Sequence, residues 1–247
     1  MRMRMFGAVV LAAVAVSCGA AECREPLRVT LTFDDGLKDH LIVAASELEK
    51  RGWRGTFNII TDRIGSKDNS LTWNDVRELV RRGHEVTTHT KSHPNLVKML
   101  KDGKADEVRR EIAESRDLIA EKTGFTPRYM CSPYVAQNEE TAKICREEKL
   151  EQMLGCRFNF GAGNEDKVGE VVAQRIAAGE KRLDILHHGI TEAGGGWRPF
   201  KDKSAFAHHL DLIAELEKEG KVVVTDYCGM AGNRPLGDKK WPHHGGR

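Results

Sequence analysis

Short β-rich runs alternate with amphipathic helical stretches along most of this chain, and this alternation constrains the fold more than any other feature. We expect strands at 28–33, 55–60, 85–88, 129–131, 152–156, 171–176, 183–186 and 222–226. We expect helices at 38–50, 73–82, 105–122, 139–149 and 205–219. Repeated strand–helix alternation favours a parallel sheet with crossover helices. No glycine fingerprint follows the first strand, so we predict a distorted (β/α) barrel of about seven parallel strands in place of a dinucleotide-binding fold.

The composition is that of a single globular domain and gives no sign of a nucleic-acid partner. Of 247 residues, 40% are hydrophobic, which is enough for one sizeable core. Lys plus Arg total 39 and Asp plus Glu total 37, and no segment combines basic with aromatic residues as nucleic-acid-binding proteins do. The six cysteines form no CxxC pair, so the sequence does not support a zinc ribbon or a thioredoxin motif. We expect most of the cysteines to be small buried residues. We place the domain at 27–228 and expect the Gly-rich, basic segment 229–247 to be a flexible tail.

The first 21 residues differ in kind from the rest. A basic start precedes an apolar run at 6–16 and then small residues, which is the order of a secretory signal. We therefore expect 1–21 to be a signal peptide of an exported protein, destined for the periplasm, the cell envelope or the medium. The residues before Cys18 resemble a bacterial lipoprotein cleavage box. Two kinds of processing fit the sequence: a lipid anchor on Cys18, and ordinary cleavage after Ala20 or Ala21. The lipid anchor would be the one membrane contact that we expect.

Polar residues follow four of the expected strands at the point where each strand ends. The first strand runs into Asp34 and Asp35, the third into His89, the fourth into a Pro-Tyr turn at Tyr134, and the seventh into His188. In a (β/α) barrel the loops after the strands form one mouth, so we expect these side chains to meet there. A surface Asp-Asp-Gly turn is the simpler explanation of the first motif, but it does not account for the histidines at the other strand ends.

His89 and His93 fit a metal site, and they also fit two unrelated polar residues. His89 and His93 are four residues apart, but Pro94 disfavours helix geometry at His93, so they are not a helical pair. A strand-end histidine, a loop histidine and one carboxylate fit a metal site that leaves positions open for water. Strand alternation sends only one of His187 and His188 into the mouth. We expect the histidines on helical stretches to be solvated or to cap helices; they are His40, His208 and His209.

Three motifs together resemble the polysaccharide deacetylases of carbohydrate esterase family 4. Residues 32–36 read TFDDG and residues 89–96 read HTKSHPNL, and the two combined are far more specific than either alone. Residues 186–188 resemble the late Leu-x-His motif of the family. The resemblance runs over 29–227, and it implies a distorted (β/α) barrel.

The resemblance also implies a role for each residue at the mouth. Asp35, His89 and His93 would bind a divalent metal, with zinc favoured. Asp34 would be the catalytic base and His188 the general acid. The reaction so implied is the removal of acetyl groups from an N- or O-acetylated poly- or oligosaccharide by metal-activated water.

The chain departs from the family pattern at two places. Cys131 stands where the third motif has an arginine, and no Asp-x-x-Asp-Trp segment is found around 158–164. Arg175, near the end of an expected strand, is a candidate to supply the missing charge and orient the base, although an ordinary surface arginine fits the sequence equally well. These departures weaken the identification of the substrate more than that of the reaction.

Two aromatic residues are candidates for contact with substrate. A backbone N–H near Tyr134 would hold the oxyanion together with the metal. Trp197 follows three glycines after the proposed acid and could stack on a sugar ring or pack in the core. Two other functions stay open: a C–N hydrolase acting on a small non-peptide amide, and an exported carbohydrate-binding protein without turnover.

Overall fold

The computed structural model describes residues 25–153 and 157–230. The strands in this part of the chain belong to one parallel sheet. They are β1 (Leu27–Asp34), β2 (Thr56–Ile59), β3 (Glu85–Thr88), β4 (Tyr129–Met130), β5 (Glu151–Gln152), β6 (Arg157–Asn159), β7 (Arg182–His187) and β8 (Val222–Thr225). Seven of them follow the order β5-β4-β3-β2-β1-β7-β6, and β8 pairs with β1 off this path. The predicted distorted (β/α) barrel of parallel strands is confirmed.

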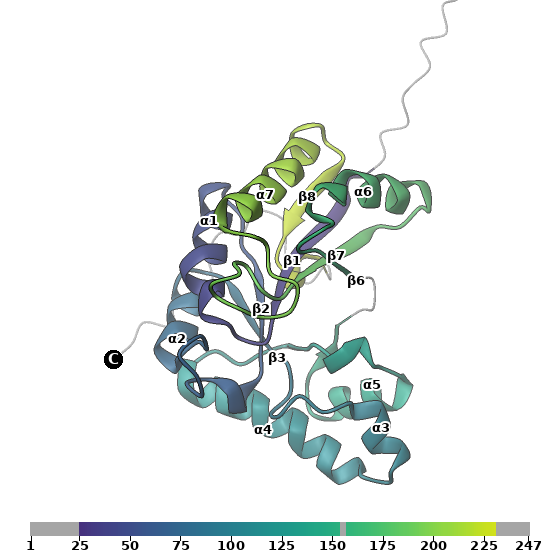
Figure 1. Cartoon of the computed structure of the whole chain (residues 1–247). Coiled ribbons are helices and arrows are strands. Elements are labelled where there is room, and N and C mark those ends of the chain that lie inside the picture. The colour runs from purple at the N-terminus through teal and green to yellow at the C-terminus, as the bar shows by residue number, and fades with distance from the viewer. Residues whose placement is uncertain (1–24, 154–156, 231–247) are drawn as a thin grey trace, which may run out of the picture.

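β1 is the centre of the sheet because three strands pair with it. β7 pairs along most of its length, from Arg28 with Arg182 to Phe33 with His187. β8 pairs with its first half and β2 with its last residues. Figure 1 shows β1, β7 and β8 side by side in the middle of the molecule. β5 and β6 are the two ends of the strand order, and no ladder joins them within the described residues, so the barrel is open there.

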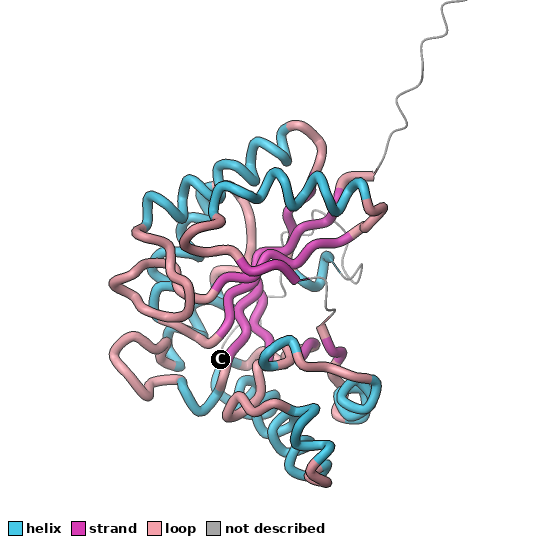
Figure 2. The backbone as a smooth tube through the Cα atoms, turned by 45° about the vertical axis from the view of Figure 1, so that its right-hand side comes forward, coloured by secondary structure: helices cyan, strands magenta, loops and turns pink. Residues whose placement is uncertain are grey.

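Helices surround the strands, which Figure 2 shows gathered in the centre. The helices are α1 (Ser46–Lys50), α2 (Trp73–Arg81), α3 (Leu96–Lys101), α4 (Ala105–Thr123), α5 (Glu139–Glu147), α6 (Val168–Ala177), α7 (Lys203–Lys218) and α8 (Tyr227–Met230). A π-helical turn, His40–Ala45, leads directly into α1. The expectation of a strand at 171–176 is wrong, because this run lies inside α6. Val168, Val171 and Val172 are buried at helical spacing, and their β-branched side chains only imitate a strand signal.

Helix ends follow the capping chemistry of the sequence. Thr72 and Asp75 form a capping box at the start of α2, and Asn138 and Thr141 form one at the start of α5. α4 ends at Gly124, whose φ of 72° lies in the left-handed region that glycine adopts without strain. These caps fix the starts of α2 and α5 and the end of α4, and so they fix where the adjoining loops begin or end.

Alternation along β1 separates an apolar outer layer from a polar interior. Leu31 and Phe33 are fully buried in the main hydrophobic core. Thr32 and Asp34 point to the opposite face, where both accept hydrogen bonds from Arg157. The inside of the barrel is therefore polar near the end of β1, where the predicted site lies.

Some expectations concern residues outside the described part of the chain. The predicted signal peptide at 1–21, with Cys18, lies there, and so does 231–247 of the predicted tail. The tail was expected from 229, but α8 extends to Met230. No helix among the described residues is long and apolar enough to cross a membrane. As expected for small core residues, the described cysteines are buried and free; they are Cys131, Cys145 and Cys228.

Two histidines form a buried pair between β7 and α7. Nε2 of His187 and Nε2 of His209 are 3.3 Å apart, and Nδ1 of His209 lies 2.8 Å from the carbonyl oxygen of Glu165. His187 stacks on Phe33 with ring centroids 5.0 Å apart, so it faces the helix layer and leaves the mouth to His188. The expectation that His209 is solvated or capping is wrong, because its polar atoms find partners inside the core.

We expect the protein to lose stability as the pH falls from 6.5 to about 4. Burial lowers the pKa of both His40 and His209 from 6.5 to about 4, and it holds the pKa of His187 well below 6.5. Within this window the unfolded chain takes up protons that the folded chain does not, so stability is complete above pH 6.5 and declines below it. His40 and His209 each contribute about 3 kcal/mol to this loss. Burial raises the pKa of Asp184 to about 6, which acts in the opposite direction but offsets only one histidine.

Denaturant unfolding at a series of pH values measures this loss. His209→Gln should reduce the dependence of the unfolding free energy on pH. His208→Gln is the matched control on the same helix, because the His208 side chain is 59% exposed, and it should leave the dependence unchanged. An unfolding free energy of the parent protein that stays flat across the window contradicts the prediction.

Candidate active site

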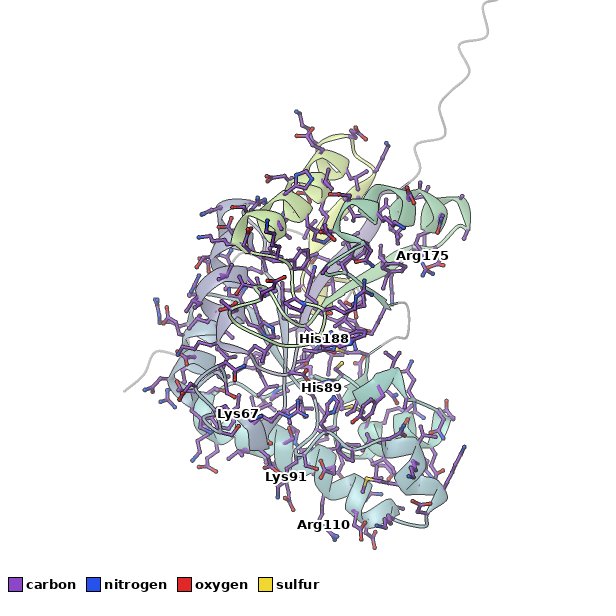
Figure 3. The ribbon with its side chains drawn as sticks, viewed as in Figure 1. Lys67, His89, Lys91, Arg110, Arg175 and His188 are labelled. Atoms are coloured by element: carbon purple, nitrogen blue, oxygen red, sulfur yellow. The ribbon has the colours of Figure 1, made fainter. Side chains whose placement is uncertain are left out.

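The strand ends bring the predicted site residues together at one end of the barrel. Asp34 is the last residue of β1, Asp35 follows it, His89 follows β3 and His188 follows β7. Oδ2 of Asp34 lies 3.6 Å from Nε2 of His89, and the charges of both His89 and His188 act on Asp34. Figure 3 shows His89 and His188 in the middle of the molecule, between the upper and the lower groups of helices.

Asp35, His89 and His93 could hold a metal ion. Each offers one ligand atom, and these atoms lie within 4.8 Å of one another. Nδ1 of His89 is 2.8 Å from the carbonyl oxygen of Cys131. A carbonyl oxygen only accepts, so His89 carries its proton on Nδ1 and leaves Nε2 free as a ligand. A guanidinium nitrogen of Arg63 lies 3.3 Å from Oδ1 of Asp35. The Arg63 side chain is 47% exposed, so its guanidinium can move into solvent when a cation binds.

A second group of ligand atoms shares His89 but is a poorer site for a cation. Asp34, His89 and Cys131 also place one ligand atom each within 4.8 Å of one another. The guanidinium of Arg157 lies 2.9 Å from both Asp34 Oδ1 and Cys131 Sγ, so a cation there would meet a buried positive charge. Burial also raises the pKa of the Cys131 thiol well above its ordinary value, which disfavours the thiolate that binds metals. The group formed with Asp35 and His93 therefore fits a divalent metal better.

The backbone at the site is strained at residues other than glycine. φ is 82° at Asp35, 67° at Thr90, 70° at His93 and 58° at Tyr134, all in the left-handed region. Each such residue costs about 1–3 kcal/mol. Oγ1 of Thr90 accepts a hydrogen bond of 3.0 Å from the backbone N–H of His93, which holds this loop in place. Two of these strained residues, Asp35 and His93, are candidate metal ligands, so the strained backbone orients their side chains.

Asp34 is only 3% exposed, yet its surroundings favour the ionised form. Nη2 of Arg157 donates to both carboxylate oxygens, at 2.9 and 3.1 Å, and Asn58 donates to Oδ1. Burial alone would raise the pKa of Asp34. The charge of Arg157, followed by those of His89 and His188 and the hydrogen bond from Asn58, nevertheless holds that pKa below its ordinary value. Asp34 is therefore a carboxylate at neutral pH and can accept a proton.

His188 is held in position from two directions. Its Nδ1 lies 3.1 Å from the side-chain oxygen of Asn159, and its backbone carbonyl accepts a hydrogen bond of 2.7 Å from Nε2 of His40. An amide oxygen only accepts, so Nδ1 carries a proton and Nε2 is the atom that can exchange one with a bound molecule. The expectation that His40 is solvated is wrong, because it is fully buried and supports the loop of His188. Its Nδ1 does accept a hydrogen bond of 3.3 Å from the backbone N–H of Leu37 at the start of the helical stretch.

Comparison with known families agrees with this arrangement. The family described as polysaccharide deacetylase matches residues 21–153, which is more than half of the chain. This chain belongs to the polysaccharide deacetylase family. The matched segment contains Asp34, Asp35, His89 and His93, and it ends before His188.

The curated relatives of this chain are deacetylases that match about half of its length. A chitin deacetylase of Arthroderma benhamiae is 31% identical over 130 residues, which are 52% of this chain and 33% of the relative. A peptidoglycan-N-acetylglucosamine deacetylase of Bacillus cereus is 27% identical over 123 residues, which are 49% of this chain and 42% of the relative. The chain thus spans less than half of the length of either relative.

Solved structures of this family share the fold over most of the chain. PdaA of Bacillus subtilis, a family 4 carbohydrate esterase, has a TM-score of 0.61 at 17% identity and covers 85% of this chain and 82% of its own. A family 4 pseudoenzyme of Bacillus anthracis has a TM-score of 0.60 at 16% identity and covers 83% of this chain and 65% of its own. Such identities show the fold alone. Because one of these proteins is a pseudoenzyme, activity has to be argued from the site residues.

The arginine beside Asp34 is Arg157, which the sequence analysis did not single out. Arg157 lies on β6, and its side chain is 5% exposed. Arg175, the residue proposed to orient the base, lies on α6 and donates to Glu180 at 2.7 Å. Figure 3 shows Arg175 at the periphery, far from His89 and His188. The assignment to Arg175 is corrected: the buried cation beside Asp34 and Cys131 is Arg157, from β6.

Two exposed aromatic residues flank the site. Tyr134 is 66% exposed, and its ring centroid is 4.8 Å from that of His93. Trp197 is 58% exposed, and its ring centroid is 5.0 Å from that of His188. Of the two roles considered for Trp197, packing in the core is therefore wrong, and a surface open to a bound molecule is left.

Proposed function

We propose that this chain is a metal-dependent hydrolase that removes acetyl groups from an acetylated poly- or oligosaccharide. The observation that carries the proposal is the position of Asp34, 2.9 Å from Arg157 and 3.6 Å from His89, directly beside the open ligand set of Asp35, His89 and His93. Membership of the family and the names of the curated relatives support a carbohydrate substrate.

The ligand set suits a divalent metal with nitrogen and oxygen ligands, and we favour zinc. Bound there, such an ion would polarise the acetyl carbonyl and lower the pKa of a water molecule towards neutrality. Asp34 takes the proton of the attacking water, and we assign this role to Oδ2 because Oδ2 is the oxygen close to His89. Oδ1 accepts hydrogen bonds from both Asn58 and Arg157, whereas Oδ2 accepts the longer bond of Arg157, at 3.1 Å.

His188 completes the proton transfer. In its protonated form it donates from Nε2 to the leaving nitrogen or oxygen, while Asn159 keeps the ring in place through Nδ1. A backbone N–H near Tyr134 supports the oxyanion, and the exposed faces of Tyr134 and Trp197 contact the sugar ring. The products are acetate and the free amine or hydroxyl of the sugar.

A non-catalytic binding protein is less well supported. Carbohydrate binding alone requires neither a buried ionised carboxylate nor an imidazole beside it, and keeping Asp34 ionised in the interior requires Arg157 to be buried as well. A C–N hydrolase acting on a small amide would use the same groups, and it differs only in the substrate.

Acetate release from a panel of substrates tests the proposal. The panel contains chitooligosaccharides, peptidoglycan, acetylated xylan and a small acetamide, each with the metal-loaded protein and with chelator. We expect chelator-sensitive release from at least one carbohydrate. Release from the small acetamide alone would favour the C–N hydrolase, and release from none of the four by a protein with bound metal would contradict the proposal.

We also propose that the protein is exported, because the order of basic, apolar and small residues at 1–21 is that of a secretory signal. The intact mass of protein from a bacterial envelope fraction should correspond to a chain beginning at Cys18 or shortly after Ala20. A mass excess of a lipid on Cys18 would identify the anchored form. A cytoplasmic protein with its first residue unprocessed would contradict export.

A further inference from the structure

Arg157 lies between two buried carboxylates that come from different strands. Its Nη2 is 2.9 Å from Oδ1 of Asp34 on β1, and its Nε is 3.0 Å from Oδ2 of Asp184 on β7. The three side chains are 5%, 4% and 0% exposed, respectively. Arg157 and Asp184 are register partners in the β6–β7 ladder, so the backbone itself sets their separation. Three strands thus deliver one row of charges that ends at Asp34.

We propose that Arg157 and Asp184 are positioning residues for Asp34: Asp184 fixes the guanidinium of Arg157, and the guanidinium fixes the carboxylate that acts as the base. The inference rests on the proposed function, in which Asp34 accepts a proton. Neither Arg157 nor Asp184 belongs to the candidate metal-binding set or to the proposed acid–base pair.

The energetics of the row point to a functional reason for it. A buried ion pair is at best about neutral for stability compared with well-packed apolar residues. Burial raises the pKa of Asp184 to about 6 in spite of the neighbouring Arg157, so this carboxylate is held at a cost. An apolar residue at 184 would fill the same buried position without that cost. What Asp184 does provide is an opposite charge 3.0 Å from Nε of Arg157, an ion pair without hydrogen-bond alignment, which holds the guanidinium close to β7.

Cys131 makes room for this arrangement. Its Sγ is 2.9 Å from Nη1 of Arg157 and 3.9 Å from Oδ2 of Asp34, and it is fully buried. A long cationic side chain at 131 would need the space that the guanidinium of Arg157 already fills and would place two positive charges together. Cys131 and Arg157 are therefore complementary: the small residue on the β4 side accompanies the arginine from β6.

The orientation of Asp34 follows from these contacts. Asn58 donates to Oδ1, and Arg157 donates to Oδ1 at 2.9 Å and to Oδ2 at 3.1 Å, while Oδ2 also faces His89 at 3.6 Å. If Arg157 were shortened, the carboxylate could rotate away from the position next to the candidate metal-binding set. A displacement of about 1 Å at a reacting group can cost about 100-fold in rate.

The test compares Arg157→Lys in two backgrounds. Lysine keeps the charge but loses the planar fork. In the parent protein, Arg157→Lys should lower kcat by about 100-fold, with KM changed much less and with metal content unchanged. In the Asp34→Asn background the same substitution should lower the residual kcat no further, because the residue acts through Asp34. Arg175→Lys is the matched control on the outer helix α6, and it should behave like the parent.

A purely structural role would give a different pattern. Arg157→Lys would then reduce activity equally in both backgrounds, in proportion to its effect on the melting temperature. That result, or a parent-like kcat in Arg157→Lys, would overturn the proposal.

Asp184→Asn gives a second approach that leaves Arg157 and Asp34 as a neutral pair. We expect a smaller loss of kcat, about 10-fold, that does not add to the loss from Arg157→Lys. Additive losses would likewise overturn it.

The failure of this inference can be distinguished from the failure of the proposed function. If the parent protein releases no acetate from any substrate, the proposed function fails, and melting temperatures then test the row of charges alone. The shifts caused by Arg157→Lys and Asp34→Asn should be non-additive if the two side chains act as one unit, and additive shifts would overturn the coupling. If the parent is active, chemical rescue is available as well: free guanidinium should restore part of the activity of Arg157→Ala, whereas equal concentrations of urea or sodium chloride should not.

Discussion

Replacing Asp34 with asparagine should lower kcat by about 100- to 10,000-fold while the protein keeps its fold and its metal. Asparagine has the shape of aspartate but cannot take a proton from water. The fold should persist because Asp184 remains beside Arg157 and balances its charge. Metal should remain because Asp34 is outside the set formed by Asp35, His89 and His93. Acetate release, elemental analysis and the melting temperature together measure these three expectations.

Asp211→Asn is the control for this change, because Asp211 is an exposed aspartate that pairs with Arg51 on the surface. It should leave kcat, metal content and stability unchanged. The assignment of the base would fail if Asp34→Asn kept near-normal turnover. A variant that lost its metal together with its activity would instead make Asp34 a ligand and would move the role of the base elsewhere.

Much of the site could be predicted because its signals are local in sequence. Asp34 and Asp35 end a strand of apolar alternation, and His89 ends another, so the barrel rule placed them at one mouth. The role of His93 as a ligand came from the resemblance of residues 89–96 to the family motif. The strand pairing and the ligand-atom distances in the structure agree with that reasoning. Sequence did not indicate that Asp35 and His93 have left-handed backbones, since nothing in their residue types requires it.

Arg157 could not be found by the same reasoning because its contact with Asp34 spans 123 residues. It depends on β6 lying beside β7 and β7 beside β1, which is a property of strand order. β6 has only three residues, too few for a periodic pattern, and the strand that we expected ended one residue earlier. The one local signal was Asp184, an aspartate flanked by Leu183 and Ile185 in β7, which needs a buried cation as its partner.

The buried histidines were misjudged for a related reason. His40 and His209 lie on helical turns, where a polar residue is usually solvated. Each of them instead pairs one ring nitrogen with a backbone carbonyl oxygen of a distant loop, at His188 and Glu165. The other nitrogen pairs with the backbone N–H of Leu37 in His40 and with His187 in His209. Helical periodicity cannot distinguish this case from exposure, because the partners are supplied by tertiary structure.

Removing the metal should abolish turnover and lower the stability of the parent protein. A chelator should stop acetate release, and added zinc should restore it. A ligand that binds only the folded protein stabilises it by about 2.7 kcal/mol at a concentration of 100 times its dissociation constant. Unfolding measured with and without zinc should therefore differ by roughly this amount. His93→Ala should bind no metal, show no activity and melt at the same temperature with and without zinc.

His93 is the right ligand to remove because its side chain is 13% exposed, whereas that of His89 is 2% exposed, so a cavity at 93 disturbs the core less. His208→Ala is the control, as an exposed histidine outside the site. Burial, together with the neighbouring His89, lowers the pKa of His93 to about 4, so the ring is neutral at pH 7 and no proton has to leave before metal binds. Zinc affinity should thus vary little down to mildly acidic pH. Full metal occupancy in His93→Ala would remove this residue from the ligand set and leave Asp35 and His89 to be completed by another group.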